Sequence, residues 1–255
     1  MASPSRVVPL GADGPDAFLF DRFVAGVARR ELADWLPDEP RTILDLSPGC
    51  SDLIGLMVDR GHTVVHTERR CRRIDIAPSH AEAGSGQLHT VRADPRLPEW
   101  LRDECVDLVV AEGGMLSDAL AAELTLEHLH RLLRPGGRLL ACVDSLVAGL
   151  SRLADLGRWA ELADVPAADV VLIPGDNGAV SRCFWPEELL GMLSAAGFDV
   201  EWIRPRTVLA EETVVRALRV DPSQLPSLVA TEQALAVRRQ GESIGPRLVA
   251  SARRR

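Results

Sequence analysis

Acidic side chains follow short apolar runs at regular intervals along the first half of the chain. Asp45 lies within the first run, at residues 42–46, and Glu68, Asp94 and Glu112 closely follow the next three. If these runs are parallel strands, their carboxyl ends meet at one edge of a sheet, where open α/β folds bind ligands. An all-acidic edge repels phosphates, so it favours a cationic nucleoside without phosphate groups.

The segment Ser47-Pro48-Gly49-Cys50 joins the first apolar run to a helical pattern that starts at Ser51. Backbone amides at such a helix N-terminus suit an anionic or polar group of a ligand. Glu68 stands 19 positions after Gly49, where an acidic residue of a nucleotide-binding fold takes ribose hydroxyls. The loop and the acids together predict a nucleoside site.

The basic residues exclude several kinds of chemistry. All 29 are Arg, and the chain contains neither Lys nor Tyr. It therefore lacks the lysine of a pyridoxal phosphate Schiff base, of a Walker A loop and of a lysine base. The Tyr/Lys proton relay of short-chain dehydrogenases is excluded for the same reason.

The net charge and the cysteine spacing limit the kinds of ligand and partner that the sequence predicts. The net charge of −8 and the pI of about 5.3 argue against nucleic acid and acidic membranes. We expect a cytoplasmic protein, because no apolar run approaches the ~20 residues of a membrane span and residues 1–21 lack a signal-peptide pattern. The five cysteines lack metal-ligand spacing, so no metal site is predicted. The sequence leaves open whether the chain forms a homodimer.

The elements that must position these residues alternate between short strands and helices, which predicts a mostly parallel α/β sheet. The apolar patterns predict seven strands, at 42–46, 62–67, 88–92, 106–111, 138–143, 198–203 and 247–252. They predict helices at 15–36, 51–60, 146–164 and 186–196, one within 221–239, and one that ends at Leu133 and is capped by Ser117 or Asp118. We expect a single domain over 1–255, with a helical cap at 1–40 and a substrate-side insert at 146–183 that is loop-rich from 165.

The ordered set of motifs resembles the class I S-adenosylmethionine (SAM)-dependent methyltransferases. Residues 43–49, Ile-Leu-Asp-Leu-Ser-Pro-Gly, resemble the family's first motif, and Glu68 matches its ribose-binding acid. Residues 93–98 resemble the segment whose Asp holds the adenine amine. Residues 129–140 resemble the helix, turn and fifth strand. The resemblance extends from about Thr42 to Val200.

This resemblance implies a Rossmann-like, doubly wound sheet of seven strands with helices on both faces and an antiparallel last strand. It implies SAM as the cofactor, held by Asp45, Ser47, Gly49, Glu68, Asp94 and Glu112. The chain departs from the family where Ser47 and Pro48 replace the usual Gly-x. Pro48 also removes a backbone donor from the loop.

Methyl transfer is an in-line displacement at a sulfonium, so positioning the acceptor supplies much of the rate. An oxygen acceptor usually needs a general base as well. Glu112, after the fourth strand, is the first candidate, and Asp144, after the fifth, is the second. The alternatives are that both acids only bind cofactor or loop, and that no base is used.

The cap and the insert are placed to select the acceptor, which we expect to be a small molecule, with specialised metabolism suggested by the resemblance alone. Trp159 and Trp185 flank the loop-rich segment and either line an apolar pocket or pack in a core. Two other functions remain open: a non-catalytic SAM- or S-adenosylhomocysteine (SAH)-binding protein, and an NAD(P)-dependent oxidoreductase. The missing G-x-G-x-x-G disfavours the oxidoreductase.

Overall fold

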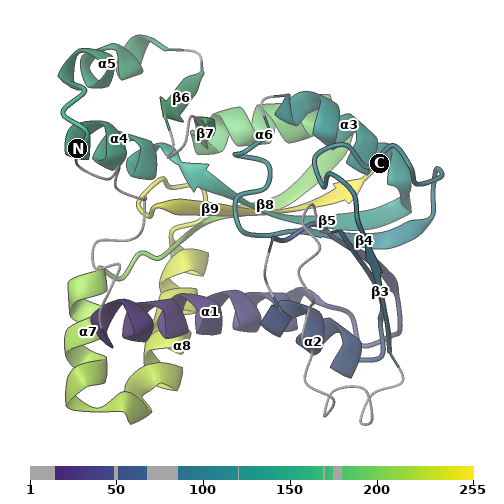
Figure 1. Cartoon of the computed structure of the whole chain (residues 1–255), viewed down its shortest axis with the longest axis horizontal. Helices are drawn as coiled ribbons and strands as arrows, with labels where there is room; N and C mark the ends of the chain where they lie inside the picture. Colours follow the sequence, from purple (N-terminus) through teal and green to yellow (C-terminus); the bar gives the residue numbers. More distant parts are fainter. Residues whose placement is uncertain (1–14, 49–50, 68–85, 120, 169, 175–179) are drawn as a thin grey trace.

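One continuous mixed sheet runs through the computed structural model, with helices packed on both of its faces (Figure 1). The structure describes residues 15–48, 51–67, 86–119, 121–168, 170–174 and 180–255. Within these residues the strands are β1 (Thr42–Asp45), β2 (Thr63–Thr67), β3 (Gln87–Val91), β4 (Val106–Ala111), β5 (Leu133–Ser145), β6 (Val171–Pro174), β7 (Val180–Phe184), β8 (Phe198–Arg206) and β9 (Arg247–Arg254). The α-helices are α1 (Pro15–Trp35), α2 (Ser51–Asp59), α3 (Ala122–Leu132), α4 (Leu146–Asp155), α5 (Trp159–Asp164), α6 (Pro186–Ala195), α7 (Glu211–Val220) and α8 (Leu225–Arg238).

The seven strands predicted from the sequence form the body of the sheet in the order β3-β2-β1-β4-β5-β9-β8. The pairs β2–β3, β1–β2, β1–β4 and β4–β5 are parallel. Strand β9 lies antiparallel to both β5 and β8. The predicted Rossmann-like sheet with an antiparallel last strand is therefore confirmed, and the carboxyl ends of its parallel strands share one edge.

The prediction of seven strands was short by two, because the insert contains a hairpin. β6 and β7 pair antiparallel, and β7 extends β5 in parallel through the pairs Asp144–Cys183 and Ser145–Phe184. Each hairpin strand has only four or five residues, too few for alternation to be distinguished from an irregular loop. The hairpin and α4 enclose a small core of their own, made of Leu146, Leu153, Val165, Val171, Ile173 and Cys183.

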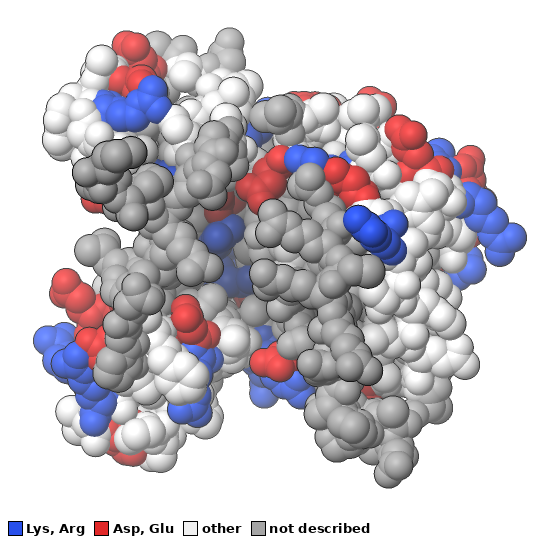
Figure 2. Space-filling view, viewed as in Figure 1, with Lys and Arg blue, Asp and Glu red and all other residues white. Residues whose placement is uncertain are grey.

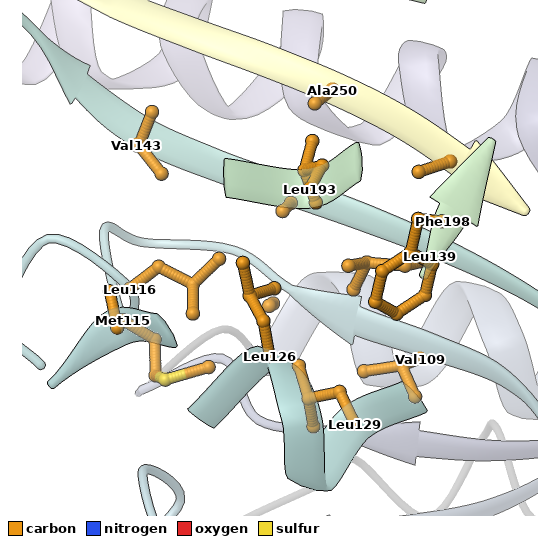
Figure 3. Close-up of a cluster of buried hydrophobic side chains, with 14 of the residues drawn as sticks. Val109, Met115, Leu116, Leu126, Leu129, Leu139, Val143, Leu193, Phe198 and Ala250 are labelled. Carbon is orange, nitrogen blue, oxygen red and sulfur yellow. The ribbon is translucent and has the colours of Figure 1, made fainter. Parts of the chain in front are cut away.

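Two apolar layers hold the helices to the sheet. Helices α3 and α6 cover one face, where side chains from β4, β5, β8 and β9 meet theirs (Figure 3). Helices α1 and α2 cover the other face. Helices α7 and α8 pack against α1 through Phe23, Val27, Val214, Leu218 and Val229. Helix α7 was not predicted from the sequence.

Three local predictions were wrong. Helix α3 begins at Ala122 without a side-chain cap, because the hydroxyl of Ser117 instead accepts the backbone N–H of Asp144 at 2.8 Å. Residues 134–137 belong to β5, where the register against β4 shifts. The last strand, predicted to end at residue 252, extends to Arg254 in β9.

Candidate functional site

The strand ends that carry the predicted acids lie next to one another at one edge of the sheet. Asp45 ends β1, Glu112 follows β4 and Asp144 lies near the end of β5, and these three strands are adjacent. Figure 2 shows a recess at this edge, between the surface formed by α4 and α5 and the surface formed by α1 and α7, with basic side chains inside it. Gly49 and Glu68 lie outside the residues that the structure describes.

Asp45 is fully buried and held by its neighbours. Its Oδ2 lies 2.6 Å from Nδ1 of His66, and its Oδ1 accepts the backbone N–H of Ser47 at 3.2 Å. The parallel register places His66 directly opposite Asp45 on β2. His66 was not predicted as a site residue from the sequence, because the pair arises from this register and not from a local pattern.

Ser47 ties the loop after β1 to the loop after β4. Its hydroxyl accepts the backbone N–H of Glu112 at 3.1 Å. The next residue, Gly113, has a φ of +70°, and a Cβ there would lie 3.2 Å from Cδ of Pro48. The residues that replace the usual Gly-x of the first motif therefore pack against the β4 loop.

Glu112 is buried in an ion-pair network that the sequence did not reveal. Arg206, at the end of β8, donates through Nη1 and Nη2 to its two carboxylate oxygens, each at 2.8 Å. The Nε of Arg206 also donates to Glu31 of α1 at 2.6 Å. Glu31, Arg206 and Glu112 (the buried triad) thus join the N-terminal helix to the end of β4.

Burial and charge act against each other within the buried triad. Burial opposes ionisation of Glu112, but the charge and hydrogen bonds of Arg206 outweigh it and lower the pKa of the carboxyl. For Glu31 burial dominates, and it raises the pKa despite Arg206. Both oxygens of Glu112 accept bonds from Arg206 and the side chain is buried, so Glu112 is poorly placed to take a proton from an acceptor.

Asp144 is also paired, but it is partly open to solvent. Its Oδ1 lies 2.5 Å from Nη1 of Arg247, the residue opposite it on β9, and its side chain is 20% exposed. Its Oδ2 accepts the hydroxyl of Ser181 at 2.8 Å. Gly114 makes room for this pair, because a Cβ there would lie 2.7 Å from Nη1 of Arg247.

Asp94 bonds within its own loop. Arg96 donates to Oδ1 through Nε at 2.9 Å and to Oδ2 through Nη2 at 2.7 Å. Arg96 is itself anchored, since its carbonyl accepts the hydroxyl of Thr125 at 2.9 Å. These hydrogen bonds join Asp45, Ser47 and Glu112 into one unit, whereas Asp94 and Asp144 each have a separate arginine.

Two further observations concern ligands and membranes. Among the described residues, no group of three His, Cys, Asp or Glu side chains is placed to hold a metal ion. No helix in this part of the chain is both long enough and apolar enough to cross a membrane.

The fold is that of Rossmann-like SAM-dependent methyltransferases. The chain is similar over 99% of its length to the 1,6-didemethyltoxoflavin N1-methyltransferase of Burkholderia thailandensis, solved with bound SAH (TM-score 0.59, 17% identity, 99% of that chain). It is similar over 89% of its length to a SAM-dependent methyltransferase of Mesorhizobium loti (TM-score 0.55, 15% identity, 98% of that chain).

A sequence relative defines the family. The chain is 30% identical over 187 residues to the ubiquinone/menaquinone biosynthesis C-methyltransferase UbiE of Rubrivivax gelatinosus, covering 68% of this chain and 69% of the relative. No family model matches the sequence. The chain belongs to the class I SAM-dependent methyltransferases, so it is a methyltransferase and SAM is its cofactor. This relationship sets aside the NAD(P)-dependent oxidoreductase.

The charges at the strand edge fit this cofactor. Three carboxyl groups, those of Glu31, Glu112 and Asp144, surround the two guanidinium groups of Arg206 and Arg247, and the carboxyl of Asp45 lies at the same edge beside His66. A weakly negative, partly buried edge favours a sulfonium cation over a pyrophosphate.

Proposed function

We propose that this methyltransferase acts on a small molecule that enters the recess at the carboxyl edge of the sheet. The observation that carries the proposal is that two segments outside the seven-stranded body of the sheet flank this edge, one formed by α1 and α7 and one by α4 and the β6–β7 hairpin (Figure 1). We assign the cap (1–40) and the insert (146–183) of a single domain (1–255) to acceptor selection. The net charge of −8 disfavours a nucleic acid acceptor, and the family resemblance suggests specialised metabolism.

We assign cofactor binding to Asp45, Ser47, Gly49, Glu68 and Asp94. Bound SAM supplies an electrophilic methyl group on a sulfonium. Asp45 is held rigid by His66, and Ser47 holds the β1 loop against the β4 loop. Such preorganisation keeps the acceptor and the methyl group aligned without reorganisation during the reaction.

We assign the general base to Asp144 and a positioning role to Glu112. One oxygen of Asp144 accepts a bond from a hydroxyl, that of Ser181, and an acceptor hydroxyl is a chemically equivalent donor. Both oxygens of Glu112 are instead engaged by Arg206. In this proposal Asp144 takes the proton of the acceptor, and Glu112 fixes the β4 loop through the buried triad.

The test begins with a screen of small-molecule acceptors, read out by SAH release. With an active acceptor, we expect Asp144→Asn to lower kcat by about 10²–10⁴ while SAH affinity, measured by calorimetry, stays unchanged. The matched control is Asp199→Asn, which removes an exposed carboxylate paired with Arg255 at the opposite end of β8; its kcat should equal that of the wild type.

Two outcomes would contradict the assignment. Equal kcat for Asp144→Asn and the wild type would show that positioning alone carries the reaction, or that another group is the base. Tight SAH binding without turnover on any acceptor class would instead favour the non-catalytic binding protein.

A further inference from the structure

A second cleft lies away from the proposed methyl-transfer site, between α1, β8 and α8. Its volume is about 590 Å³, within the range of small-molecule sites. Six of the residues that line it are Glu31, Trp35, Trp202, Arg204, Gln233 and Val237. None of the described residues assigned to cofactor binding lines this cleft.

Two arginine–tryptophan stacks form part of its wall. The guanidinium of Arg138 lies 4.7 Å from the ring centre of Trp35, and that of Arg204 lies 4.1 Å from the ring centre of Trp202. The Trp35 indole also donates to the hydroxyl of Ser251 at 2.9 Å. This part of the wall is held in place before any ligand binds, which lowers the entropic cost of binding.

Most charged groups of the cleft already have an opposite charge. Glu31 pairs with Arg206, Asp34 with Arg30 at 3.1 Å, and Arg138 with Glu201 at 2.9 Å. Arg204 is the cation left for a ligand, because no ion pair of Arg204 is found within the described part of the chain.

Arg204 has an unsatisfied hydrogen-bond donor among the described residues. Its Nε is buried, and no acceptor for it is present among the described residues. Burial lowers the pKa of this guanidinium, and the nearby Glu31 only partly offsets the effect. An unpaired buried donor on a charged group is costly, and an anion beside this guanidinium would offset part of that cost by neutralising its charge.

We propose that this cleft binds a small organic monoanion with a flat apolar body, of the aromatic carboxylate class. A carboxylate of the ligand pairs with the partly exposed guanidinium of Arg204, and the ring lies along Trp202, Trp35 and the small side chains Ala234 and Ala236 of α8. One anionic charge suffices, since Arg204 is the one charged group of the cleft without an ion pair among the described residues, and the tryptophans supply apolar contact.

The test uses the full chain saturated with SAH, so that the cofactor site is filled. The probes are 2-naphthoate and its neutral analogue 2-naphthalenemethanol, titrated by calorimetry. We expect naphthoate to bind at least tenfold more tightly than the alcohol, and Arg204→Gln to remove that preference. The matched control is Arg219→Gln, which removes an exposed arginine of α7 paired with Asp16 and should leave both affinities unchanged.

The position of the probe is checked separately by NMR. Naphthoate should shift the indole N–H signals of Trp35 and Trp202 in the wild-type protein. Equal affinity for acid and alcohol, unchanged naphthoate binding by folded Arg204→Gln, or unshifted indole signals would each overturn the proposal. The two wild-type measurements decide the matter even where Arg204→Gln does not fold.

Discussion

Arg206 supplies the positive charge of the buried triad, so replacing it tests how much this ion-pair network stabilises the fold. Arg206→Met keeps much of the side-chain volume but leaves Glu31 and Glu112 buried beside each other without their cation. Removing one partner of a buried ion pair typically costs about 3–5 kcal/mol. A domain has only about 5–15 kcal/mol of unfolding free energy, so we expect a large loss at about pH 7.

The same substitution should change the pH dependence of stability. In the wild type the pKa of Glu112 is lowered and that of Glu31 is raised, so their contributions to the pH dependence oppose each other. Without Arg206 both pKa values rise, and the folded variant binds more protons than its unfolded chain. Its unfolding free energy therefore falls as the pH rises from about 5 to about 7, relative to the wild type.

Urea unfolding at both pH values measures these effects, provided that the m-value is unchanged. The matched control is Arg30→Met, which removes an equal charge from the exposed Arg30–Asp34 pair of α1 and should cost less than about 1 kcal/mol. Adding Glu112→Gln to Arg206→Met should restore part of the stability at the higher pH. A loss below about 1 kcal/mol, equal at both pH values, would refute the electrostatic account of the buried triad.

Two further predictions follow from the close contacts and burial near the site. Gly114→Ala and Gly136→Ala both place a Cβ on a left-handed backbone, which costs about 1–2 kcal/mol. The Cβ at position 114 would also meet Arg247, whereas nothing lies within 4 Å of a Cβ at position 136. Urea unfolding should therefore show the larger loss of stability for Gly114→Ala, and equal losses would contradict the contact. Burial raises the pKa of the Cys142 and Cys183 thiols to about 12, so a thiol reagent at about pH 8 should modify them only after unfolding, and peptide mapping that finds either one labelled in the folded protein would contradict this.

The local pattern of the sequence predicted most of the sheet. The strands from β1 to β5 and β8 to β9 are apolar runs bounded by turn residues, a signal that short-range chemistry carries. The acids at their carboxyl ends were found for the same reason, because Asp45 lies within such a run and Asp94 and Glu112 closely follow one. The β6–β7 hairpin and α7 were missed, since the hairpin strands are short and α7 is an outer helix that packs on α1.

The partners of these acids could not be predicted, because they come from distant parts of the chain. Arg206 lies 94 positions from Glu112, and Arg247 meets Asp144 only through the antiparallel pairing of β5 and β9. His66 meets Asp45 through the register of β1 and β2. Arg96 is the exception, and its spacing of two residues from Asp94 is a local signal that sequence reasoning overlooked.

These pairs make the edge of the sheet less negative than its carboxylates alone would suggest. From the sequence, four carboxylates suggested a strongly negative rim, but each of the described ones, Asp45, Asp94 and Glu112, contacts a histidine or an arginine. Arg presents a planar fork that engages both oxygens of a carboxylate, as Arg96 and Arg206 do. The rim therefore fixes geometry more than it supplies charge. Arg206 also bonds to Glu31 of α1. The same guanidinium therefore holds both α1, which we propose to select the acceptor, and the end of β4, which we propose to position it.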